Sequence, residues 1–131
     1  KNKINLGMVV MDGAFLVGKV VEVNYLSSRV LLLSDLNSKI PVIVEPNAVF
    51  SILSGTGKDY GIIQYSKKYE DIKNESVIYT SGVGSLFKAG IPIGKMNNLS
   101  DEKKVEFFSD FSQLKFVKVV SFKKSENKWQ G

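Results

Sequence analysis

Residues 16–45 decide the fold, and they read Leu-Val-Gly-Lys-Val-Val-Glu-Val-Asn-Tyr-Leu-Ser-Ser-Arg-Val-Leu-Leu-Leu-Ser-Asp-Leu-Asn-Ser-Lys-Ile-Pro-Val-Ile-Val-Glu. Three runs rich in aliphatic and β-branched residues, 16–26, 29–33 and 39–45, are separated by short stretches containing Ser, Asp and Asn. The apolar residues in these runs keep no three-and-four spacing, which argues against a helix. Runs of this kind are typical of β-strands. The stretch therefore predicts three consecutive antiparallel strands, a β meander.

The rest of the chain contains more short segments of the same kind. Asp12-Gly13 is a turn pair, because glycine supplies the positive φ that such turns need. The most polar stretch, 66–76, is predicted to connect two halves of the chain. Further strands are predicted at 8–11, 49–53, 61–65, 77–80, 91–96, 103–110 and 115–122. The pattern as a whole indicates an all-β protein.

The two halves carry similar motifs in the same order. Val17-Gly18-Lys19-Val20 in the first half resembles Ile93-Gly94-Lys95-Met96 in the second, and Ser34-Asp35 resembles Ser109-Asp110. A period of roughly 75 residues predicts a degenerate repeat of one β unit. Two small β-barrels or sandwiches built from such units would stabilise each other by packing together. Chance similarity between two strand sets rich in valine and glycine is the alternative.

Composition excludes several classes of function. The 131-residue chain has 44% hydrophobic and 24% charged residues, which is normal for a globular protein. It contains no cysteine and no histidine, which excludes structural zinc sites and any catalytic triad or dyad built on histidine. The net charge is +5, but Arg29 is the single arginine. Because arginine is the usual reader of base edges, this balance argues against sequence-specific nucleic-acid binding.

Motifs that match catalytic or phosphate-binding patterns lack the context that those patterns need. The segment from Gly13 to Lys19 satisfies the first part of a phosphate-binding loop, but Val20 replaces the Ser or Thr that would hold magnesium. The segment also runs into a predicted strand, whereas a phosphate loop opens a helix. The acidic pairs Glu70-Asp71 and Asp101-Glu102 are predicted to lie in solvated turns. The sequence therefore predicts no enzyme activity, no metal and no cofactor.

The alternative function is single-stranded nucleic-acid binding by an OB-like β-barrel. That function needs a basic groove with aromatic side chains on the same face for base stacking. The candidate stacking residues are Tyr60, Tyr65, Tyr69, Phe116 and Phe122. A third hypothesis is an adaptor domain of an exporter, which shares G-x-V-x-x-V strand patterning but lacks the S-R-V-L-L-L stretch.

The order and spacing of several motifs resemble the extracytoplasmic domain of the rod shape-determining protein MreC family, over nearly the whole chain. The motifs that carry the resemblance are Gly7-Met8-Val9-Val10, Leu16-Val17-Gly18-Lys19-Val20, Ser28-Arg29-Val30-Leu31-Leu32-Leu33-Ser34-Asp35, Asn37-Ser38-Lys39-Ile40-Pro41-Val42, Ile52-Leu53-Ser54-Gly55-Thr56-Gly57, Val77-Ile78-Tyr79-Thr80-Ser81-Gly82, Gly90-Ile91-Pro92-Ile93-Gly94-Lys95 and Asp110-Phe111-Ser112-Gln113-Leu114.

The resemblance implies an all-β fold of two small packed β-barrels, about six strands each, from a degenerate repeat of one β unit. Residues 1–66 are expected to form the first barrel unit and 67–131 the second, with strand exchange between them allowed. The chain begins inside the first unit, so upstream strands that complete the first barrel are expected outside this sequence. A membrane helix and a coiled coil, also upstream in the family, are absent from it.

The resemblance also implies function. It predicts a non-catalytic scaffold of the bacterial cell-elongation machinery that maintains rod shape. The expected partners are cytoskeletal MreB, membrane MreD, and peptidoglycan synthases, namely a class B penicillin-binding protein and its associated glycosyltransferase. Self-association into a homodimer or filament is expected, and nucleic-acid binding is not. The expected location is the periplasm, as a domain of an inner-membrane-anchored protein.

The residues carried over from the family motifs are expected to be structural, and the partner-binding residues stay unknown. These motif residues are Gly7, Gly18, Ser28, Arg29, Asp35, Asn37, Ser38, Gly82, Gly90, Pro92 and Gly94. Arg29 is predicted to bridge to Asp35 and Asn37 and so to fix the turn at 34–38 through charge-assisted hydrogen bonds. The chain departs from the family at Glu75-Ser76, where Gly-Asp is usual, and at Phe87-Lys88, where Phe-Pro is usual.

Overall fold

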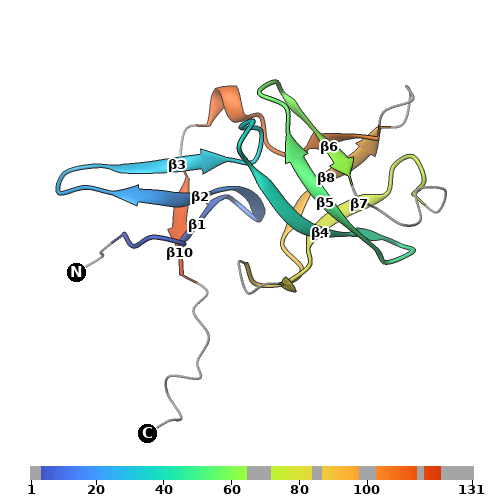
Figure 1. Cartoon of the computed structure of the whole chain (residues 1–131), viewed down its shortest axis with the longest axis horizontal. Helices are drawn as coiled ribbons and strands as arrows, with labels where there is room; N and C mark the ends of the chain where they lie inside the picture. Colours follow the sequence, from blue (N-terminus) through green and yellow to red (C-terminus); the bar gives the residue numbers. More distant parts are fainter. Residues whose placement is uncertain (1–3, 65–71, 84–86, 98–102, 115–116, 122–131) are drawn as a thin grey trace, which may run out of the picture.

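The computed structural model describes residues 4–64, 72–83, 87–97, 103–114 and 117–121. Within these ranges the chain forms two antiparallel β assemblies, which lie at opposite ends of the molecule (Figure 1). The strands are β1 (Val9–Asp12), β2 (Phe15–Val23), β3 (Ser28–Leu32), β4 (Lys39–Glu45), β5 (Val49–Gly55), β6 (Tyr60–Gln64), β7 (Val77–Thr80), β8 (Pro92–Asn97), β9 (Lys104–Phe107) and β10 (Lys118–Val120), and a short 3-10 helix, η3 (Phe111–Gln113), precedes β10.

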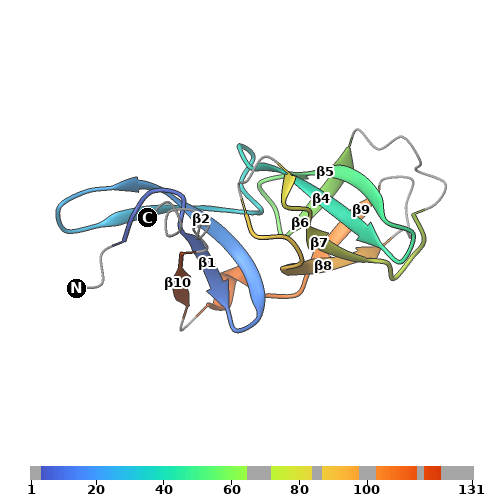
Figure 2. The ribbon, with the colours of Figure 1, turned by 90° about the horizontal axis from the view of Figure 1, so that it is seen from below.

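The first assembly is an open sheet in the strand order β10-β1-β2-β3. Gly18 of β2 lies between Val10 of β1 and Leu32 of β3. The buried members of its own small apolar cluster are Val10, Val17 and Val20. The β2–β3 hairpin continues past this sheet and points away from the barrel, as Figures 1 and 2 both show.

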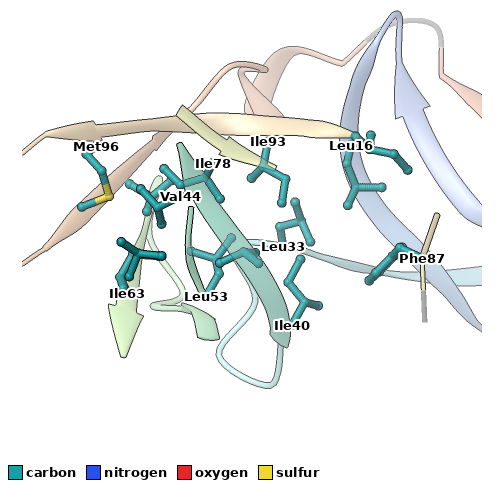
Figure 3. Packing of buried hydrophobic residues seen from close by; sticks show 14 of the residues in the cluster. Leu16, Leu33, Ile40, Val44, Leu53, Ile63, Ile78, Phe87, Ile93 and Met96 are labelled. Carbon is teal, nitrogen blue, oxygen red and sulfur yellow. The ribbon is translucent and has the colours of Figure 1, made fainter. Parts of the chain in front are cut away.

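The second assembly is a closed barrel of six strands in the order β4-β5-β6-β9-β8-β7, which the pairing of β4 with β7 completes. Residues of β4 alternate between buried and half-buried, as expected of a strand with one face in a core. The barrel interior is filled by aliphatic side chains such as Leu53 and Ile78 (Figure 3). Leu16 and Leu33 belong to the same cluster, so the two assemblies share one continuous core.

The predicted meander is correct for its first two strands and wrong for the third. Strands β2 and β3 pair with each other, but β4 pairs with β5 and β7 instead of β3. The turn at residues 34–38 redirects the chain, because Asp35 accepts a hydrogen bond from the Asn37 N–H at 2.8 Å and caps a tight bend. The apolar face of β4 is then buried in the barrel. Only one barrel is closed among the described strands, so the second barrel stays a prediction.

The two three-stranded units β1–β2–β3 and β7–β8–β9 have the same strand order and antiparallel pairing, except that a bulge between Val20 and Glu22 interrupts the β2–β3 ladder. Gly94 of β8 takes the central place between β7 and β9 that Gly18 takes between β1 and β3. The register shifts once in each first hairpin, after Val10 and after Ile78. The motifs that look alike in the two halves of the sequence therefore occupy like positions in the two units.

The strand that follows each three-stranded unit in the chain pairs with the other unit. Strand β4 follows β3 in the chain but pairs with β7, while β10 follows β9 but pairs with β1. The barrel thus combines strands from 1–66 with strands from 67–131, and so does the open sheet. The barrel also contains β5 and β6, and the described part of the open sheet has no strands in the corresponding places.

Candidate functional site

The connection between β7 and β8 is much longer than its counterpart in the first unit. Two residues join β1 to β2, whereas residues 81–91 join β7 to β8. Thr80 fixes the base of this loop, because its hydroxyl donates to the Lys88 carbonyl at 2.6 Å and accepts the Ile91 N–H at 2.9 Å. A loop longer than its topology requires is a common place for a binding surface.

A groove of about 570 Å³ runs along the β4–β5 hairpin beside the start of this loop. It is lined by residues of the hairpin between 41 and 52 and by Ser81 and Val83. Its largest exposed apolar side chains are Phe50, which is 60% exposed, and Val83, which is 55% exposed. None of the residues that line it is charged. The groove is therefore suited to uncharged, apolar side chains.

A second hollow of about 470 Å³ is also lined by Ser81. It contains one carboxylate, from Glu45, and one phenol, from Tyr79. Within the described ranges no group of acidic side chains could hold a metal ion. The chain has no histidine or cysteine to add to such a group.

Two of the predicted motif residues, Gly18 and Gly94, mark the closest backbone approaches in their units. A Cβ added to Gly18 would lie 2.4 Å from the carbonyl oxygen of Leu31, and one added to Gly94 would lie 2.3 Å from that of Glu106. Both distances are far below a van der Waals contact. Glycine is needed here for space rather than for backbone conformation.

The other predicted motif residues lie in turns and at strand ends, and the structure does not gather them into one site. Ser28 begins β3, Pro92 begins β8, Ser38 is buried after the first turn, and Gly7, Gly82 and Gly90 have φ of 84°, 81° and 86°. Their role as structural residues stays a prediction.

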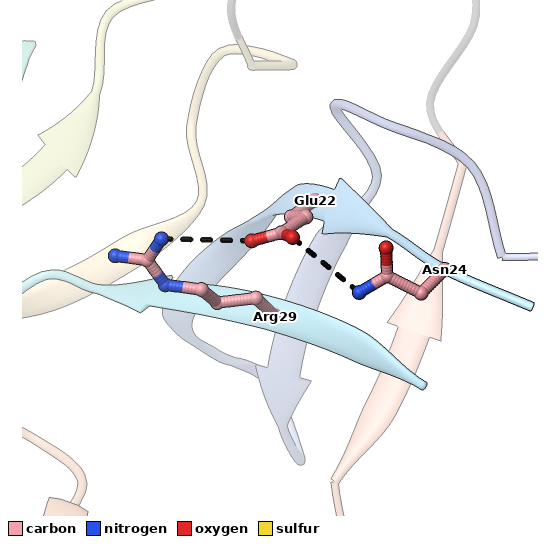
Figure 4. A network of polar contacts seen from close by, with 3 residues as sticks. All are labelled: Glu22, Asn24 and Arg29. Carbon is pink, nitrogen blue, oxygen red and sulfur yellow. Dashed lines mark hydrogen bonds and ion pairs between the residues drawn. The ribbon is translucent and has the colours of Figure 1, made fainter. Parts of the chain in front are cut away.

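The predicted role of Arg29 is wrong. Its guanidinium forms an ion pair with Glu22 at 3.6 Å, and Glu22 also accepts a hydrogen bond from Asn24 at 3.4 Å (Figure 4). Arg29 lies opposite Glu22 in the β2–β3 ladder. The nearest carboxylate partner of its side chain is therefore Glu22, not the turn at residues 34–38. Both side chains are about half exposed or more, and exposed ion pairs of this kind contribute little to stability.

The turns at Asp35 and Asp110 are built alike. Each carboxylate accepts a hydrogen bond from the backbone N–H two residues later, that of Asn37 at 2.8 Å and that of Ser112 at 3.0 Å. The Ser112 hydroxyl also donates to Asp110 at 2.6 Å. The hydroxyl hydrogen bond, followed by the backbone one, lowers the pKa of Asp110 below its ordinary value of 3.8.

The departures from the family pattern do not abolish the local structure. Glu75 has φ of 69°, close to the 84° of Gly7 in the first unit. Glycine adopts this positive-φ conformation more easily than glutamate does. The Glu75 carboxylate forms an ion pair with Lys95 at 3.1 Å. Phe87 is 7% exposed and belongs to the core cluster, so the loop keeps a buried anchor without a following proline.

Of the five candidate stacking residues for nucleic-acid binding, one lies in the described ranges. Tyr60 has the Lys104 ammonium 4.4 Å from its ring centroid, so one face of this ring contacts a lysine of the same chain. The other candidates, Tyr65, Tyr69, Phe116 and Phe122, lie outside the described residues. The described part of the structure therefore shows no row of free stacking side chains.

Sequence reasoning missed four exposed apolar residues that the structure brings out. Phe50 and Val83 border the groove, and Tyr25 and Leu26 form the tip of the β2–β3 hairpin, 98% and 89% exposed. A signal for the last two was present, because hairpin tips normally carry Gly, Asn or Asp. Bulky apolar residues at such a position do not serve the turn.

The fold and the site define a β-barrel protein with an uncharged surface groove and an exposed apolar hairpin tip. No described segment forms a helix long and apolar enough to cross a bilayer. Residues 1–121 match the family described as rod shape-determining protein MreC, barrel core. The chain belongs to the MreC family of cell shape-determining proteins.

Similar proteins have the same description. The cell shape-determining protein MreC of Cereibacter sphaeroides is 31% identical over 121 residues, which are 92% of this chain and 40% of that protein. Its counterpart from Caulobacter vibrioides is 32% identical over 92% of this chain and 35% of its own length. The chain thus spans less than half of these relatives. The crystal structure of MreC from Pseudomonas aeruginosa superposes with a TM-score of 0.79 at 29% identity, over 90% of this chain and 81% of that one.

Proposed function

We propose that this chain is a non-catalytic scaffold domain of the cell-elongation machinery, which binds a class B penicillin-binding protein. Membership of a cell shape-determining family carries the proposal. The solved complex between penicillin-binding protein PBP2 and MreC from Helicobacter pylori contains a chain of the same fold, with a TM-score of 0.70 at 17% identity. The uncharged groove and the absence of histidine and cysteine also fit a binding protein better than an enzyme.

The wider assembly is part of the proposal. We infer that the domain lies in the periplasm and that the whole protein links MreB and MreD to the synthase and its glycosyltransferase. Self-association belongs here too, since a relative with a TM-score of 0.76 and 23% identity is described as a cell shape-determining filament.

The open sheet is proposed to be part of a second barrel. By its match to the barrel unit, a hairpin of two strands equivalent to β5 and β6 would bridge β10 and β3. The residues of β3 that correspond to the β6-facing residues of β9 are Arg29, Val30 and Leu31. A free sheet edge is otherwise an open template for strand addition.

The proposed function is tested by binding of the purified 131-residue chain to the periplasmic part of a class B penicillin-binding protein, measured by biolayer interferometry. Saturable binding is expected, and it should persist when single-stranded DNA is added in excess. Failure to bind the synthase, combined with tight DNA binding that weakens steeply with salt, would reverse the assignment in favour of a nucleic-acid module.

A further inference from the structure

The tip of the β2–β3 hairpin is built for contact rather than for turning. The Asn24 N–H donates to the Ser27 carbonyl at 2.7 Å, which closes the hairpin and leaves Tyr25 and Leu26 alone at its end. They are 98% and 89% exposed, the most exposed of the large hydrophobic side chains within the described ranges. A fully exposed tyrosine is a typical anchor for a protein interface, because its large ring buries much apolar surface on contact, and Leu26 adds apolar area beside it.

The tip and the groove have matching chemistry. Neither Tyr25 nor Leu26 carries a charge, and neither does any residue that lines the groove beside Phe50 and Val83. The groove, at about 570 Å³, lies within the range of roughly 300–1,000 Å³ that is usual for sites that enclose a ligand group. Apolar side chains entering it would leave no buried charge unpaired.

The tip does not reach the groove of its own chain. The hairpin extends from the open sheet at one end of the molecule and points away from the barrel, which carries the groove (Figures 1 and 2). The two complementary surfaces are therefore available to different copies.

We propose that the Tyr25–Leu26 tip of one copy docks in the groove of the next, at Phe50 and Val83. Such a contact joins two different surfaces, so every copy keeps one unused tip and one unused groove. An arrangement of this type grows into an open chain of subunits unless its rotation happens to close a ring. The inference specifies a contact for the self-association in the proposed function and is independent of synthase binding.

The size and charge of the contact set its strength. A two-residue tip buries much less than the roughly 1,200 Å² of a stable interface, so the association is weak and concentration-dependent. Each copy carries a net charge of +5, so copies repel one another at low salt. Because salt screens that repulsion while the contact itself is uncharged, association strengthens as salt rises, the opposite of nucleic-acid binding.

Sedimentation velocity on the 131-residue chain tests the contact, over roughly 10 μM to 1 mM, a range chosen for weak complexes. The wild type is expected to form multimers, and the tip variant Tyr25→Ser/Leu26→Ser and the groove variant Val83→Glu should each weaken association by at least about tenfold. An equimolar mixture of the two variants should stop at a dimer, because only one tip and one groove remain competent. Leu6→Ser, at a side chain that is 65% exposed, is the matched control and should associate like the wild type.

Cysteine pairing gives a second readout, because the chain has no cysteine of its own. Under mild oxidation, the double variant Leu26→Cys/Val83→Cys is expected to give a ladder beyond the dimer on a non-reducing gel. The control Leu6→Cys/Val83→Cys should give much less. Equal ladders, a ladder that ends at the dimer, or a wild type that stays monomeric at high salt and high concentration would overturn the proposal.

Synthase binding by the same variants separates this inference from the proposed function. The tip variant is expected to bind the penicillin-binding protein as the wild type does. If Val83→Glu abolishes synthase binding and the wild type does not self-associate, the groove belongs to the synthase and the tip-in-groove contact is refuted. If the variants lose multimers but no chain binds the synthase, the contact stands and the proposed function falls.

Discussion

Gly18 and Gly94 show what a single missing carbon permits in this fold. Each sits in the middle strand of a three-stranded unit, and the backbone of the third strand comes within 2.4 Å and 2.3 Å of the place where a Cβ would be. A backbone carbonyl held in a ladder cannot turn aside as a flexible side chain can. The same residue type recurs at the same place in both units because the same approach recurs.

Replacing Gly18 or Gly94 by Ala is expected to lower the free energy of unfolding by about 1–3 kcal/mol, since the added carbon forces the strands apart. Urea denaturation measures the change. Gly13→Asn is the control, because no atom lies within 4 Å of its Cβ position and Asn tolerates a positive φ. The control should stay within about 0.5 kcal/mol of the wild type. Equal losses at all three positions would show that the close approach is not the cause.

Asp110 offers a test by pH. Ser112→Ala removes the hydroxyl hydrogen bond and is expected to raise the pKa of Asp110 toward 3.8, while the backbone N–H retains part of the lowering. Because the folded pKa lies below the unfolded one, the stability from this ionised carboxylate is present above pH 3.8 and is lost as pH falls through the folded pKa. NMR titration of the side-chain carboxyl carbon measures the shift. An unchanged pKa in the variant would contradict the assignment of the cause.

At the level of strands, the two β assemblies differ in how well they are buried. The barrel strands surround most of the large core cluster, whereas the separate cluster of the open sheet has only three buried residues, all valines. Strand β10 has only three residues and is paired along one edge within the described structure. The two assemblies therefore have unequal resistance to local opening, because opening depends on buried contacts.

Native-state hydrogen exchange should reveal this inequality. Amides of β4 to β9 are expected to exchange more slowly than those paired between β1 and β10. Ile78→Ala, at a fully buried barrel position, should cost about 2–5 kcal/mol and speed exchange mainly in the barrel. Protection that is equal in both assemblies, or greater in the open sheet, would contradict the prediction.

The sequence predicted where strands occur much better than which strands pair. The predicted runs 39–45 and 77–80 coincide with β4 and β7, because alternation and turn residues are local signals. One of the two partners of β4 is β7, more than thirty residues away, and no local pattern carries that information. The same limit explains the error at Arg29, since its contact with Glu22 depends on the register that follows a bulge in β2.

For the molecule as a whole, the sequence was most informative about class and least informative about surfaces. The lack of histidine and cysteine excluded structural zinc sites and histidine-based catalytic triads or dyads. The order of the motifs indicated the family. The groove could not be foreseen, because it needs residues near 50 and 83 to lie side by side after the barrel closes. The tip residues Tyr25 and Leu26 looked like part of a valine-rich strand until the hairpin was seen to end there.

The exchange of β4 and β10 has a mechanical consequence. Two domains on one tether can swivel and separate under tension, but here two strands cross in opposite directions between the assemblies. A pull on either assembly is shared by both crossings, and twisting one against the other would have to tear a strand out of a ladder. The molecule is therefore expected to transmit tension and torsion between its two assemblies as one rigid body.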